Sequence, residues 1–83
     1  MVLDARGWLD RYAAVLGLPP VSDLEVDSLL TLSGVAAHAS ERTAAPISCY
    51  LAARAGVPVD EALAAAHRLA DELAESEGSR DAG

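Results

Sequence analysis

The chain lacks most of the residues that build β-sheets. It has no phenylalanine, one tryptophan, two tyrosines and one isoleucine among its 83 residues. Because aromatic and β-branched side chains favour strands, this scarcity disfavours a sheet. Alanine, a strong helix former, supplies much of the 52% hydrophobic content. The composition therefore predicts an all-α fold.

Lysine is also absent, so arginine supplies all six basic residues against 13 acidic ones, for a net charge of −7. Such a surface repels nucleic acids and anionic membranes. No apolar run approaches the roughly 18 residues that a membrane-spanning helix needs. The first residues also lack the basic start and apolar run of a secretory signal. We therefore expect a cytoplasmic protein without a nucleic-acid or membrane partner.

The single cysteine, Cys49, cannot form an internal disulfide, which is compatible with a reducing compartment. His38, Cys49 and His67 fall on three different predicted helices and lack metal-ligand spacing, so we expect no metal site. Nucleophilic catalysis by Cys49 with His38 would need a third, orienting group, and the sequence offers none. A non-catalytic role is favoured.

Periodicity and capping signals predict one domain over residues 1–76, a compact bundle of four short helices, with a polar, frayed tail over 77–83. The expected helices cover residues 5–16, from about 24–27 to 41, from near Pro46 to Gly56, and 58–76. Asp4 suits the first N-cap, and Ser22 with Glu25 has the form of a capping box. Gly17 and Gly56 stand where left-handed C-terminal caps are expected.

The predicted junction between the second and third helices carries a candidate anion site. His38 and Arg42 are four residues apart, so they share a helix face. The third helix should begin with free N–H groups, which attract anions. We therefore name His38, Arg42, Thr43 and Ser48 as candidate ligands for a phosphate or carboxylate. The alternative is structural: Arg42 caps a helix end, Thr43 and Ser48 bond to backbone groups, and His38 packs.

The same region carries a resemblance to a known family. The residues that carry it are Trp8, Leu16-Gly17-Leu18, Ala37-His38, Arg42, Ala44-Ala45-Pro46 and Tyr50-Leu51. They resemble a small uncharacterised helical domain of high-GC bacteria, found alone or fused C-terminally to molybdenum-cofactor guanylyltransferase-like proteins. The resemblance covers roughly residues 3–74, and Thr43 stands where the family usually has proline. It implies an accessory role in molybdopterin-dinucleotide synthesis or insertion.

Two other function classes stay open. Length, acidity and Asp27-Ser28-Leu29 at a helix start resemble acyl or peptidyl carrier proteins, in which the serine accepts a phosphopantetheine arm. The absence of glycine before Asp27 and the short first loop count against a carrier. Alternatively, exposed Trp8 or Tyr12 could be buried against another chain. The expected partners are therefore a protein or a second copy, and a small anionic ligand.

Overall fold

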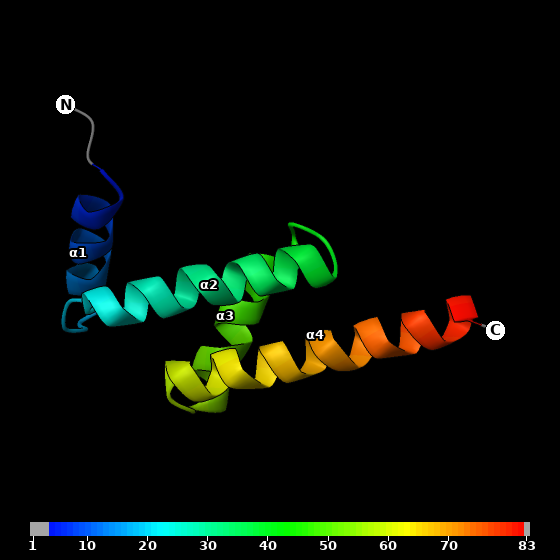
Figure 1. Cartoon of the computed structure of the whole chain (residues 1–83). Helices are drawn as coiled ribbons and strands as arrows, with labels where there is room; N and C mark the ends of the chain where they lie inside the picture. Colours follow the sequence, from blue (N-terminus) through cyan, green and yellow to red (C-terminus); the bar gives the residue numbers. More distant parts are fainter. Residues whose placement is uncertain (1–3, 83) are drawn as a thin grey trace.

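The computed structural model describes residues 4–82, which form four helices and no strand. The helices are α1 (Ala5–Val15), α2 (Asp23–Ala39), α3 (Ala44–Ala55) and α4 (Val59–Ala82). Helices α2 and α4 run side by side and in the same direction, and α3 runs back from the end of α2 to the start of α4 (Figure 1). The predicted all-α bundle of four helices is confirmed.

The capping residues that the sequence predicts stand at helix ends in the structure. The Asp4 carboxylate accepts a hydrogen bond from the Gly7 amide at 2.7 Å. Ser22 and Glu25 form a reciprocal capping box at the start of α2. Gly17 and Gly56 both adopt positive φ angles, +74° and +73°, after α1 and α3. Each of these signals is a short-range interaction that neighbouring residues specify.

The helix bounds differ slightly from the expected ones. Helix α3 begins at Ala44, which leaves Pro46 inside the first turn, where its missing N–H costs nothing. Helix α4 continues to Ala82, past the expected end near residue 76. No proline follows Pro58, so nothing in the sequence forbids a continuous helical backbone there. Gly83, the end of the expected tail, lies outside the described residues.

Helix packing is unequal across the molecule. Helix α2 packs against both α3 and α4, whereas α1 packs against no other described helix. Arg6 connects α1 to the start of α2, because it donates to the Val21 carbonyl and lies 3.5 Å from the Asp23 carboxylate. Helix α1 therefore projects from the unit formed by α2, α3 and α4 (Figure 1).

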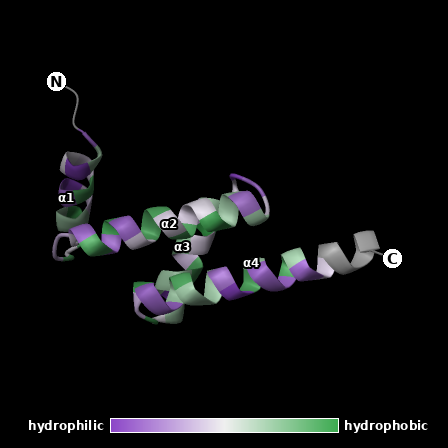
Figure 2. Cartoon of the chain, in the orientation of Figure 1, coloured by the Kyte–Doolittle hydropathy of each residue, from purple (hydrophilic) through white to green (hydrophobic). Residues whose placement is uncertain are grey.

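The buried core is very small. Within residues 4–76 only Ala13 and Leu32 are buried, with Leu32 just 3% exposed. The radius of gyration is 15.5 Å, whereas a compact domain of this length has about 12 Å. Hydrophobic and hydrophilic stretches alternate along the helices (Figure 2), and all four helices carry large hydrophobic side chains that are exposed. Much of the apolar surface of one chain is therefore exposed.

Candidate interaction surface

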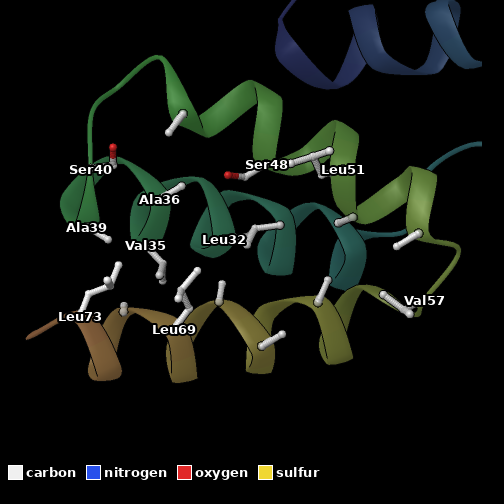
Figure 3. A pocket seen from close by; sticks show the side chains of 17 residues that line it. Leu32, Val35, Ala36, Ala39, Ser40, Ser48, Leu51, Val57, Leu69 and Leu73 are labelled. Carbon is white, nitrogen blue, oxygen red and sulfur yellow. The ribbon is translucent and has the colours of Figure 1, made fainter. Parts of the chain in front are cut away.

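An apolar groove with a volume of about 410 Å³ lies over one face of α2, α3 and α4 (Figure 3). It is lined by Leu32, Val35, Ala36, Ala39, Ser40, Ala44, Ser48, Leu51, Ala52, Ala55, Val57, Ala62, Ala65, Ala66, Leu69, Ala70 and Leu73. No charged side chain belongs to this set, and Ser40 and Ser48 are its only polar members. The groove is therefore an apolar surface in contact with water.

Alanine determines the shape of the apolar groove. Nine of the 17 lining residues are alanines, whose short side chains leave the helix backbones open to close approach. The larger side chains of Leu51, Leu69 and Leu73 stand along it and are about half exposed (Figure 3). A floor of small residues between larger ones suits the packing of another helix.

The apolar side chains of α4 form a stripe that the other helices cover only in part. Its members Ala66, Leu69 and Leu73 line the groove, at alternating spacings of three and four residues. Val59 and Leu63 are half-buried and do not line it. The stripe is too wide for one contact, so part of it stays uncovered after α4 has packed on α2.

The structure does not gather the four predicted anion ligands into one pocket. Ser48 lines the apolar groove, and His38 lines a neighbouring hollow. Arg42 and Thr43 are exposed and line neither. His38 turns back onto its own helix, with its Nδ1 atom 2.8 Å from the Gly34 carbonyl. These positions leave anion binding as a prediction of the sequence.

The start of α3 also differs from the expected row of free donors. The Ala44 amide donates to the Glu41 carbonyl at 2.9 Å, and the Ala45 amide donates to the Arg42 carbonyl at 3.1 Å. The Thr43 side chain makes no capping hydrogen bond. Two of the first backbone amides of α3 therefore already donate hydrogen bonds within the chain, which leaves fewer free N–H groups for an anion.

The second hollow, of about 400 Å³, adjoins the groove and shares Val35, Ala39, Ala70 and Leu73 with it. His38, His67 and Asp71 are its ionisable members. No group of three or more His, Cys, Asp or Glu side chains with metal-binding geometry occurs in the part of the chain that the structure describes. The sequence did not predict that the two histidines line one hollow, because they lie on different helices.

The other candidate residues have structural surroundings. The Cys49 Sγ atom is half-buried, 3.4 Å from the Ser33 hydroxyl and 4.0 Å from the Leu29 carbonyl. Ser28, the candidate carrier serine, is half-buried in the second turn of α2, since the helix begins at Asp23. The structure thus surrounds Cys49 with α2 groups and places Ser28 away from the helix start.

Helix α1 presents an apolar surface of its own. The rings of Trp8 and Tyr12 stack, with centroids 5.8 Å apart and planes inclined by 17°. Trp8 is 58% exposed, and Val15 and Leu16 are exposed too. Both aromatic residues of α1 are therefore exposed in one chain, which is the alternative that the sequence left open for them. The groove was not predicted from the sequence. Its one available signal was the stretch after Leu51, which is rich in alanine and leucine and contains no aromatic residue.

No helix within residues 4–82 combines the length and the apolar character needed to cross a membrane. A family model described as a domain of unknown function, DUF6457, matches residues 3–82. The comparison with curated proteins gave no match, and neither did the comparison with solved structures. The family match spans nearly the whole chain, so it includes both α1 and the groove.

Proposed function

The chain belongs to the DUF6457 family of unknown function, and we propose that it is a non-catalytic interaction module. In this proposal it associates with a second copy of itself, and the apolar groove is the surface that becomes buried. The observation that carries the proposal is the large accessible surface of one folded chain, on which an uncharged groove and many large hydrophobic side chains stay exposed.

The accessible area of the chain supports this proposal quantitatively. One copy exposes 6587 Å², whereas a folded monomer of 8.5 kDa exposes about 4,700 Å². The excess of about 1,900 Å² is more than the roughly 800 Å² that each partner buries in a standard complex. It falls within the range of obligate homodimers. A partner that covers the groove would give this small chain the core it lacks.

Two neighbouring alanines of α4 offer a matched test. Ala65 lines the groove and Ala64 does not, and both are exposed in one copy. Ala65→Glu should therefore be tolerated by the single chain, but it places a carboxylate in the surface that association buries. We expect Ala65→Glu to weaken association at least about tenfold, and Ala64→Glu to leave it nearly unchanged.

Sedimentation velocity over a range of protein concentrations measures this difference, and far-UV circular dichroism checks that both variants remain helical. The proposal predicts a dimer for the natural sequence and for Ala64→Glu, and a monomer for Ala65→Glu. A natural sequence that stays monomeric at all concentrations would contradict it. A dimer that is equally sensitive to both substitutions would place the interface outside the groove.

The location and the biological role of this module are proposed from the sequence alone. We propose a cytoplasmic location, because a lone cysteine suits a reducing compartment. The resemblance to the high-GC bacterial domain supports an accessory role near molybdopterin-dinucleotide synthesis. Carrier function at Ser28 stays a prediction, which intact mass after coexpression with a phosphopantetheinyl transferase tests: an unmodified serine removes it.

A further inference from the structure

We propose that the segment that fills the apolar groove is α1 of a second copy. Each chain would insert its α1 into the groove of the other, giving a reciprocally exchanged dimer. This inference rests on the proposed function and adds which segment the groove receives. Four features of the described residues support it: the surface of α1, its length, its attachment and its charge.

Helix α1 is the one described helix without a helical neighbour, yet it carries the largest apolar side chains of the molecule. Trp8 and Tyr12 form a continuous stacked surface, and Leu16 extends it by one more turn. The groove has the opposite character, since small alanines make up its floor. Large side chains on one element and small ones on the other are complementary in shape.

The two surfaces also match in length. Helix α1 has 11 residues and is about 16 Å long. On α4 the groove extends from Ala62 to Leu73, and the same rise per residue gives about 16 Å. One α1 helix can therefore cover the groove along its full extent on α4.

The attachment of α1 directs it away from the groove of its own chain. The Leu18 amide bonds to the Ala13 carbonyl at 2.8 Å, and the Arg6 contacts to Val21 and Asp23 hold α1 beside the start of α2. On α2 the groove begins only at Leu32, nine residues, or about 13 Å, further along. If α1 folded back onto α2 of its own chain, it would mostly cover the first half of α2, before the groove begins.

Charge favours α1 over the other helices as the inserted element. In α1 and its cap, Arg6 and Arg11 balance Asp4 and Asp10, so this region is neutral. The seven excess negative charges of the chain therefore all lie after residue 22. Two α4 helices placed together would bring their acidic residues close, whereas insertion of α1 adds no net charge. Two identical exchanges related by a two-fold axis leave no groove open.

Trp8 is the only tryptophan, so its indole protons report the position of α1 without any substitution. We would mix ¹³C-labelled and unlabelled chains, unfold and refold them together, and record isotope-filtered NOEs between chains. The exchanged dimer predicts NOEs from the Trp8 indole of one chain to the methyl groups of Ala66 and Leu69 of the other. These contacts can arise only when α1 of one copy lies in the groove of the second.

A substitution gives an independent measurement. Trp8→Ala should raise the dissociation constant of the dimer at least about 30-fold, because buried tryptophans dominate the energy of such interfaces. Leu30→Ala is the control, since Leu30 is also a large exposed apolar residue but does not line the groove. It should change the dissociation constant less than about threefold.

The outcomes separate this inference from the proposed function. A dimer that Ala65→Glu disrupts, but whose intermolecular NOEs come from another segment, overturns the insertion of α1 and leaves the function standing. Trp8–groove NOEs that appear in a uniformly labelled sample and vanish in the mixed one mean that α1 closes its own groove, which also overturns it. A natural sequence that never dimerises removes both proposals.

Discussion

Helix α1 and the unit of α2, α3 and α4 both leave apolar surface exposed, but for different reasons. Helix α1 has clear local signals, with Asp4 at its start and a left-handed Gly17 after its end, but no helix packs on it. The other three helices pack on one another, but share a face that stays open. The comparison teaches that good helix signals do not imply a core, because caps specify where a helix ends and not what it contacts.

The largest effect expected from a single substitution lies in the packed unit. Leu32 is 3% exposed at the centre of α2, and Leu32→Ala should lower the free energy of unfolding by about 2–5 kcal/mol through lost burial and a cavity. Urea unfolding followed by circular dichroism at fixed protein concentration measures the loss.

The matched control is Leu30→Ala, on the same helix but 66% exposed. It should change the free energy of unfolding by no more than about 0.5 kcal/mol. Equal losses in the two variants would mean that Leu32 is not the anchor of the packed unit, and would remove the contrast with α1.

A second substitution tests the boundary between the two regions. Gly17 has a φ of +74°, so Gly17→Ala should cost about 1–2 kcal/mol although nothing lies within 4 Å of the added methyl group. Gly34 also has open space around it but lies within α2, so Gly34→Ala should stabilise the chain by up to about 1 kcal/mol. Thermal unfolding distinguishes the two, and destabilisation by both substitutions would contradict this account, because both positions have open space and only Gly17 has a positive φ.

The smallest effect on stability is expected at the predicted anion site. Arg42 is exposed, so Arg42→Ala should change the free energy of unfolding by less than about 0.5 kcal/mol. If the sequence prediction is right, the same variant loses the heat of phosphate binding in calorimetry, as does His38→Ala. No heat from inorganic phosphate with the natural sequence would make the prediction wrong and leave Arg42 a solvated side chain.

The helices could be predicted from the sequence more completely than the candidate functional site. Asp4, Ser22 with Glu25, Gly17 and Gly56 act on residues within one turn, so the sequence shows their effect directly. The candidate site was inferred from side chains close together in sequence, between His38 and Ser48. The structure separates them, because His38 bonds back to Gly34 while Ser48 faces another helix across the groove.

The sequence by itself determined that this chain is helical, which residues cap its first two helices, and that its surface is acidic, since all three depend on composition and short-range interactions. Only the tertiary structure decided that alanines and leucines between Leu32 and Leu73 form one open groove. That outcome depends on how α2, α3 and α4 pack, and on α1 standing apart from them. Such long-range packing brings together residues that no local pattern connects.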